Sequence, residues 1–202
     1  MVTFGGLGTN WGLAAALYGR EHGMRVVLAL VNQPVDEHVR AQQARLRASG
    51  ARLYFTHRRT RTIAAIPWLL VRHAGGGRPP YLLPAGGSSA VGALGYVDAA
   101  LELAAQVRAG ELPEPSHVVV AVGSSGTAAG LVLGLRLAGL SSRVTGVVVN
   151  DGLPLDAEHI VRLARRTERV LRDRGARLPA VELEPAAVTM VRDWIGPGYG
   201  HH

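Results

Sequence analysis

The stretch that decides the fold is VVVAVGSSGTAAG, residues 118–130, in which an apolar run leads directly into a glycine-rich loop. Residues 118–122 have the β-branched character of a buried strand, and a Leu-rich helical pattern follows the loop. Two glycines allow a close backbone turn, while the Ser and Thr hydroxyls and the free N–H groups of the helix start point at one place. The sequence therefore predicts a cradle for a phosphate or a carboxylate.

The same loop does not match two common nucleotide-binding patterns. It lacks the Gly-Lys-Ser/Thr ending of a P-loop and the G-x-G-x-x-G spacing of dinucleotide folds. Nucleotide binding is therefore disfavoured. Taken alone, the loop is also compatible with a tight strand-to-helix turn that binds nothing.

All 22 basic side chains of the 202-residue chain are arginine, so the sequence contains no lysine. No side chain here can form a Schiff base with a bound aldehyde. The sequence has no cysteine either, which excludes disulfides, thiolate catalysis and Cys-ligated zinc. With 48% hydrophobic residues, no run of about 18 apolar residues and no signal-peptide pattern, the composition predicts a cytoplasmic globular protein without a membrane span.

The net charge of +7 raises the question of a nucleic-acid or membrane partner. The densest arginines, in residues 162–174, alternate with acidic residues and have no interleaved aromatic side chains, which favours a solvated helix face. We therefore predict neither a nucleic-acid nor a membrane partner. The one compact basic run is Arg58-Arg59-Thr60-Arg61, for which contact with an anion stays an alternative.

Strand and helix patterns alternate along the chain, which is typical of an α/β fold with two parallel or mostly parallel sheets flanked by helices. Strands are expected at residues 2–4, 24–31, 52–55, 118–122, 144–149 and 181–183. Helices are expected at residues 11–22, 36–49, 60–73, 90–108, 131–140 and 156–174, with Pro67 kinking or dividing the third. The run GGGRPP at residues 75–80 marks a crossing between a small domain, 1–80, and a larger one, 81–202.

Other loops carry polar residues with two interpretations. Thr9 and Asn10 are expected at a helix start, where they can cap the helix or bind a ligand. Ser88 and Ser89 share this ambiguity, and Tyr199, between two glycines, could lie over a ligand or pack in a turn. The eight histidines show no metal-ligand spacing, so no metal site is predicted.

Four motifs in order resemble the D-cysteine desulfhydrase and 1-aminocyclopropane-1-carboxylate deaminase family, pyridoxal-phosphate enzymes of the tryptophan synthase β type. They are GGLGTN at 5–10, PAGGSSAVGALGY at 84–96, GSSGTAAG at 123–130 and GYG at 198–200. The resemblance covers nearly the whole chain, and residues 84–96 are its most specific part. Where the family usually reads Gln-Ser-Asn-His, this sequence has Gly-Thr-Asn-Trp at residues 8–11.

The resemblance implies a fold type II architecture, a pyridoxal 5′-phosphate cofactor and a small amino acid as substrate. It implies a lyase or hydrolase that releases ammonia and a keto acid, in a cytoplasmic homodimer when full length. Cofactor-binding roles fall on Asn10, Gly123, Ser124, Ser125, Gly126 and Thr127, and catalytic roles on Thr9 and Tyr199. The family's lysine would precede residue 1, so we expect a fragment truncated at both ends that is inactive alone, or else a non-catalytic phosphate-binding remnant.

Overall fold

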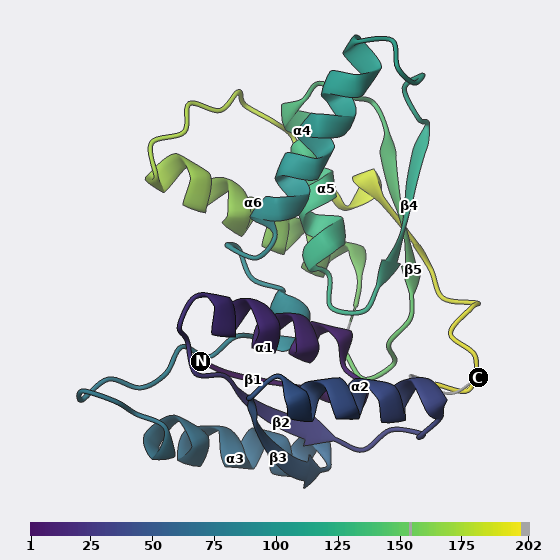
Figure 1. Ribbon diagram of the computed structural model, residues 1–202. Helices are drawn as coiled ribbons and strands as arrows, with labels where there is room; N and C mark the ends of the chain where they lie inside the picture. Colours follow the sequence, from purple (N-terminus) through teal and green to yellow (C-terminus); the bar gives the residue numbers. More distant parts are fainter. Residues whose placement is uncertain (154, 199–202) are drawn as a thin grey trace. The chain divides into compact units, whose positions relative to one another are not determined.

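The computed structural model describes residues 1–153 and 155–198, and its contacts divide the chain into two compact units, Met1–Gly86 and Gly87–His202 (Figure 1). Each unit contains a three-stranded parallel sheet accompanied by helices. The α/β class and the two parallel sheets predicted from the sequence are therefore confirmed.

Residues 81–83 stay with the first unit through backbone pairing. Val2 donates its N–H to the Tyr81 carbonyl at 2.9 Å, and its own carbonyl accepts from the Leu83 N–H at 2.8 Å. The glycine and proline run at 75–80, where the sequence predicts the domain crossing, precedes this pairing. The units divide further along the chain, between Gly86 and Gly87, because a segment bonded to the first strand shares its sheet.

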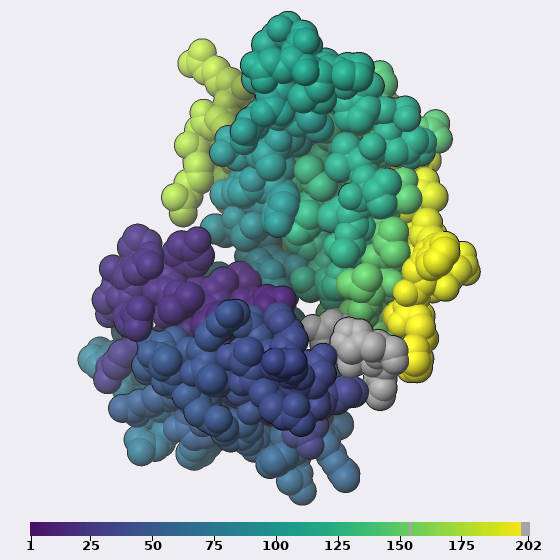
Figure 2. All heavy atoms as spheres, turned by 45° about the vertical axis from the view of Figure 1, so that its right-hand side comes forward, coloured from purple at the N-terminus to yellow at the C-terminus, as the bar shows by residue number. Residues whose placement is uncertain are grey.

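The first unit is a parallel sheet in the order β1-β2-β3, with helices on both faces (Figure 1). Its strands are β1 (Val2–Gly6), β2 (Val27–Val31) and β3 (Arg52–His57), and its helices are α1 (Asn10–Glu21), α2 (Glu37–Ala48) and α3 (Arg59–Arg72). Alternate residues of β2 point to opposite faces. Leu28 and Leu30 pack with Leu46 of α2, whereas Val27 and Ala29 pack with Leu69 of α3. In the space-filling view α2 (blue) forms part of the outer surface of this unit (Figure 2).

Helix ends in this unit follow the local sequence. The Asp36 carboxylate accepts the Val39 N–H at 2.7 Å and caps α2. Gly23 and Gly50 follow α1 and α2 with positive φ angles of 69° and 81°, as expected where helices stop at glycine. Pro67 lies inside α3, which continues through it from Arg59 to Arg72, so this helix is not divided.

The second unit has one core between a parallel sheet, in the order β4-β5-β6, and three helices. The short helix η1 (Ala85–Gly87) spans the division between the units. The elements of the second unit are α4 (Leu94–Arg108), β4 (His117–Val122), α5 (Gly126–Leu137), β5 (Arg143–Val148), α6 (Ala157–Asp173), η2 (Pro185–Ala187) and β6 (Val188–Val191). Residues 128–135 of α5 are buried throughout, which makes α5 the central helix. On β4 the outward side chains stay accessible, with Val119 67% exposed.

Three sequence predictions in this unit differ from the structure. The helix expected at residues 131–140 is α5, which begins at Gly126 and ends at Leu137, so the second half of the predicted glycine loop is helical. Residues 181–183 form no strand, because the strand that pairs with β5 is β6, after Pro185. The Leu183 carbonyl accepts from Arg165 of α6 at 2.7 Å instead. The helix expected from residue 90 begins at Leu94 instead. The reason is local, since the Ser89 hydroxyl accepts the Gly92 N–H at 3.0 Å and holds a turn ahead of the helix.

Within the described ranges, no helix is long and apolar enough to cross a membrane. The same residues contain no group of three His, Asp or Glu side chains placed to hold a metal ion. The carboxyl-terminal stretch up to residue 198 (yellow) lies on the surface of the second unit in Figure 2.

Candidate functional site

The loop at residues 123–125 joins the carboxyl end of β4 to the amino end of α5 and is shorter than the loop predicted over residues 123–130. Ser125 immediately precedes α5 with a φ of 76°, a left-handed conformation that L side chains rarely adopt. Its side chain does not cap the helix. Such strain at a strand-to-helix junction in an open sheet is a feature of ligand-binding loops.

The Ser125 hydroxyl is the strongest indication that this loop binds a ligand. Ser125 is 3% exposed, and within the described residues its Oγ is the one buried side-chain oxygen or nitrogen without a hydrogen-bond partner. Leaving such a group unsatisfied costs about 1–3 kcal/mol. A bound oxyanion would accept this hydrogen bond and remove the penalty.

Ser88, from the loop after η1, holds the serine loop in place. Its Oγ donates to the Ser124 Oγ at 2.9 Å and accepts the Gly126 N–H, also at 2.9 Å. A Cβ at Gly126 would lie 2.8 Å from this Oγ, so only glycine admits the contact. From the sequence, Ser88 could either cap a helix or bind a ligand. In the structure its side chain contacts the loop at residues 123–126.

Asn150 is a contact that the sequence prediction missed. Its Nδ2 donates to the Gly123 carbonyl at 3.0 Å, and its Oδ1 accepts the Gly152 N–H at 2.8 Å. The signal that could have found it is its position two residues after β5, since neighbouring parallel strands end at the same edge of a sheet. Asn150 thus supports the first glycine of the loop.

The arrangement can hold a phosphate. The first-turn N–H groups of Thr127 and Ala128 have no intrahelical acceptor, and the helix dipole adds partial positive charge there. The Ser125 and Thr127 hydroxyls supply further donors, and no charged residue lies within 123–130. These groups fit a dianionic phosphate, held by hydrogen bonds rather than by a cation.

The second candidate loop lies in the first unit, between β1 and α1. Thr9 caps α1, because its Oγ1 accepts the Gly12 N–H at 3.0 Å, and the residue is only 7% exposed. Two glycines pack against it. A Cβ at Gly5 would lie 2.6 Å from the Thr9 Oγ1, and one at Gly12 would lie 2.4 Å from its Cγ2.

Asn10 is exposed at the first position of α1, with its side chain oriented by α2. Its Oδ1 accepts from the Nε2 of Gln42, and the Oε1 of Gln42 in turn accepts from the Arg45 guanidinium at 3.0 Å. Gln33 also contacts this loop, where the Gly8 N–H donates to the Gln33 Oε1 at 3.2 Å. The sequence did not indicate either glutamine, because both are far from the loop along the chain.

The predicted site residues therefore form two groups. Ser124, Ser125, Gly126 and Thr127 lie together with Gly123 in the second unit, and Thr9 and Asn10 lie together in the first. Tyr199 lies outside the described residues. Two pockets of the second unit lie along residues 180–187 and not at the serine loop. The one of about 560 Å³ is also lined by α6, and the one of about 490 Å³ by Arg136 and Arg143.

Known proteins are similar to this chain in sequence and in fold. A model of the family described as pyridoxal-phosphate dependent enzyme matches residues 2–200. The chain is 39% identical over 125 residues to a D-cysteine desulfhydrase of Klebsiella pneumoniae (strain 342), a match that covers 61% of this chain and 34% of the relative.

Solved structures show the same fold. An ACC deaminase homologue superposes with a TM-score of 0.77 over 99% of this chain, at 23% identity. A T.th. threonine deaminase gives a TM-score of 0.56 over 80% of this chain, at 20% identity. The chain covers 57% and 48% of these two proteins, so it spans about half of their length.

Proposed function

This chain belongs to the family of pyridoxal-phosphate dependent enzymes, and we propose that it is part of a deaminase or desulfhydrase-like lyase. The proposed substrate is a small amino acid of the D-cysteine or 1-aminocyclopropane-1-carboxylate type, and the products are ammonia and a keto acid. The observation that carries the proposal is the buried, unpartnered Ser125 hydroxyl at the start of α5. The 39% identity to a D-cysteine desulfhydrase supports the substrate class.

The family match confirms the predicted cofactor class, pyridoxal 5′-phosphate, and the structural matches confirm the fold type II architecture. When bound, this cofactor supplies an electron sink for bond cleavage at the amino acid's α-carbon. We assign its phosphate to the loop of the second unit. The holding groups are the Ser125 and Thr127 hydroxyls and the first N–H groups of α5, with Gly123, Ser124 and Gly126 shaping the loop through Asn150 and Ser88.

In the first unit we assign Asn10 to the pyridine hydroxyl and Thr9 to the substrate carboxylate and a proton. The Gly12 N–H already occupies a lone pair of the Thr9 Oγ1, so Thr9 can offer the proton of its own hydroxyl to a ligand. The Oδ1 of Asn10 already accepts a hydrogen bond from Gln42, so the Nδ2 of Asn10 is the group that donates to a ligand. For Tyr199 we propose a catalytic role on the resemblance alone.

The absence of lysine from residues 1–202 supports reversible, non-covalent binding of the cofactor by this chain. We propose that these residues alone do not turn over substrate, and that the full-length enzyme is a cytoplasmic homodimer. The same absence favours the second candidate, a non-catalytic protein that retains the phosphate loop. Borohydride reduction of the loaded protein, followed by peptide mapping, should attach no cofactor to this chain.

A titration with pyridoxal phosphate tests the cofactor assignment. We expect saturable binding, seen as a change in cofactor absorbance, that the Ser125→Ala variant weakens about tenfold through loss of one charge-assisted hydrogen bond. Ser141 is exposed and lies outside the loop at residues 123–126, so Ser141→Ala provides a matched control. Equal binding by all three proteins, or none by the wild type, would contradict the assignment.

A further inference from the structure

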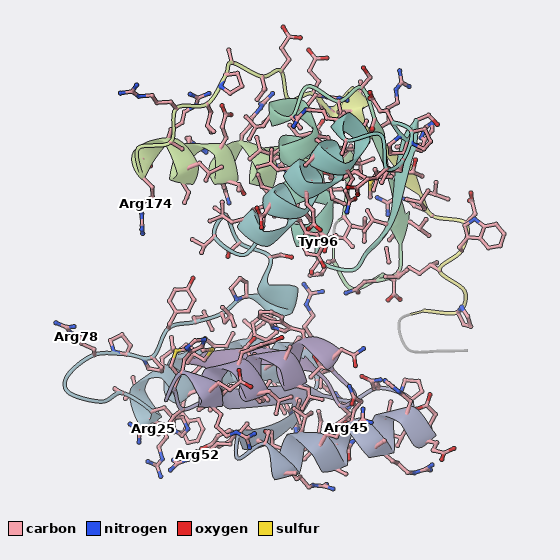
Figure 3. All side chains as sticks on the ribbon, turned by 45° about the horizontal axis from the view of Figure 1, so that its top comes forward. Arg25, Arg45, Arg52, Arg78, Tyr96 and Arg174 are labelled. Atoms are coloured by element: carbon pink, nitrogen blue, oxygen red, sulfur yellow. The ribbon has the colours of Figure 1, made fainter. Side chains whose placement is uncertain are left out.

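Arginines from three elements gather at the amino-terminal edge of the first sheet, the end opposite the Thr9 loop. Arg25 precedes β2, and Arg52 begins β3 beside Val27 in the parallel register. α3 runs back to this edge, so that Arg72 and His73 at its end line the same pocket. Figure 3 shows Arg25 and Arg52 extending from one edge of the unit.

These side chains line a pocket of about 420 Å³, which residues 74, 75 and 78–80 also line. Cavities of roughly 300–1,000 Å³ are typical of small-molecule sites. The pocket lies wholly within the first unit. Its walls therefore come from residues whose relative positions are set by one sheet and its helices.

A tight turn completes the rim and brings in a fourth arginine. Gly75 and Arg78 exchange two backbone hydrogen bonds of 3.1 Å, and the intervening Gly76 and Gly77 have φ angles of 58° and 76°. Positive φ at both central positions is the geometry of a type I′ turn. A Cβ at Gly75 would lie 3.5 Å from the Arg25 Nη2, so this guanidinium rests against the turn.

The pocket carries positive charge that is not balanced by carboxylates. No Asp or Glu lines it, and none of Arg25, Arg52, Arg72 and Arg78 forms an ion pair with a side-chain carboxylate of the described residues. The pKa of His73 responds to the positive electrostatic potential of these arginines. Burial and then Arg52, Arg72, Arg25 and the amino-terminal nitrogen lower its pKa, while the Tyr54 hydroxyl lies 2.9 Å from its Nε2.

We propose that this pocket binds a small oxyanion with at least two negative charges, of the phosphate-ester or pyrophosphate class. Guanidinium groups match the oxygens of a phosphate in a bidentate manner and stay charged at every physiological pH. Four of them around one pocket attract a multiply charged anion, whereas a single carboxylate would leave most of the charge unmatched. The proposal is independent of the cofactor assignment in the second unit.

Calorimetric titration with pyrophosphate at about 0.15 M salt tests the site. We expect pyrophosphate to bind, and the Arg25→Gln/Arg52→Gln double variant to weaken this binding about tenfold or more through lost charge-assisted bonds. The Arg40→Gln/Arg47→Gln variant removes the same charge from exposed positions of α2. Its Kd should change less than about twofold, because remote exposed charges are screened.

Ser125→Ala separates this site from the proposed cofactor loop, and it should leave unchanged the pyrophosphate binding that depends on Arg25 and Arg52. An NMR titration supplies a local readout, since a bound anion should raise the pKa of His73 by offsetting its arginine neighbours. The proposal is wrong if pyrophosphate does not bind, if both arginine pairs weaken it equally, or if Ser125→Ala abolishes it. Tighter, strongly salt-dependent binding of an oligonucleotide at Arg25 and Arg52 would also overturn it in favour of a nucleic-acid surface.

Discussion

Ser125 combines a left-handed backbone with a buried hydroxyl that has no partner among the described residues. Because an unsatisfied buried hydroxyl destabilises the folded state, we expect Ser125→Ala to raise the free energy of unfolding without cofactor by about 1 kcal/mol. Urea denaturation, monitored by circular dichroism, measures this change. The same variant should bind pyridoxal phosphate more weakly, so stability and binding move in opposite directions.

Exposed Ser141 gives the reference for that measurement, since Ser141→Ala should change neither quantity. A destabilised Ser125→Ala would mean that the hydroxyl has a partner in the folded protein. Its role in the loop would then be structural, and the inference of a phosphate site would lose its main support.

Local sequence patterns identify residues that act within one segment. They do not identify residues that contact that segment from a distant part of the chain. The strand, glycine loop and helix at residues 118–137 could be predicted because the apolar run, the glycines and the Leu-rich pattern are contiguous. Asn150 and Gln42 were missed, because each contacts its loop through the pairing of strands or the packing of helices, 27 or more residues away along the chain. For Asn150 the position just after β5 is the one available signal, whereas nothing in the sequence indicates Gln42. The Arg25 pocket is a further case, since its arginines are spread from residue 25 to residue 78.

The packing of α4 on α5 depends on two glycines of α5 where the helices meet. A Cβ at Gly130 would lie 2.4 Å from the Ala93 carbonyl oxygen and 2.6 Å from the Tyr96 Cβ, and one at Gly134 would lie 2.6 Å from the Ala100 Cβ. Backbone atoms cannot move aside as side-chain ends can. The α4–α5 contact therefore requires residues without side chains.

We predict that Gly130→Ala destabilises the second unit by about 1–3 kcal/mol, because the added methyl group forces the two helices apart. Gly95 on α4 provides the matched control. A Cβ there meets nothing within 4 Å, so Gly95→Ala should stabilise by about 0.5–1 kcal/mol through helix propensity. Denaturant unfolding of both variants measures the difference, and equal effects would show that α4 and α5 are not in close contact.

Helices were predicted better than the last strand, for a physical reason. α6 begins at a cap formed by Asp156, whose carboxylate accepts the His159 N–H at 2.6 Å, and it is followed by Gly175 with a φ of 90°. Residues 181–183 and 188–191 are similar short apolar stretches, and only pairing with β5 selects the second as β6. Tertiary contacts, not local composition, decide between such segments.

The two units have separate hydrophobic cores, so their unfolding has to be measured separately. Trp11 and Trp68 lie in the first unit, and Trp68 packs edge-on against Tyr54 with ring centroids 5.6 Å apart. Trp194, in the second unit, is 77% exposed. In a Trp194→Phe background, tryptophan fluorescence therefore reports the first unit alone.

This background permits a test of the pH dependence that His73 imposes on the first unit. Burial and the charges of Arg52, Arg72, Arg25 and the amino terminus lower its pKa in the folded state below the usual 6.5. The unfolded chain then binds a proton more readily than the folded one, so stability is highest above pH 6.5 and falls as the pH drops through the folded pKa. We expect the urea midpoint to decrease between about pH 7 and pH 5, and His73→Gln to reduce that decrease. Parallel curves for the two proteins would mean that the arginines around the pocket do not act on His73, and would remove the electrostatic support for an anion site there.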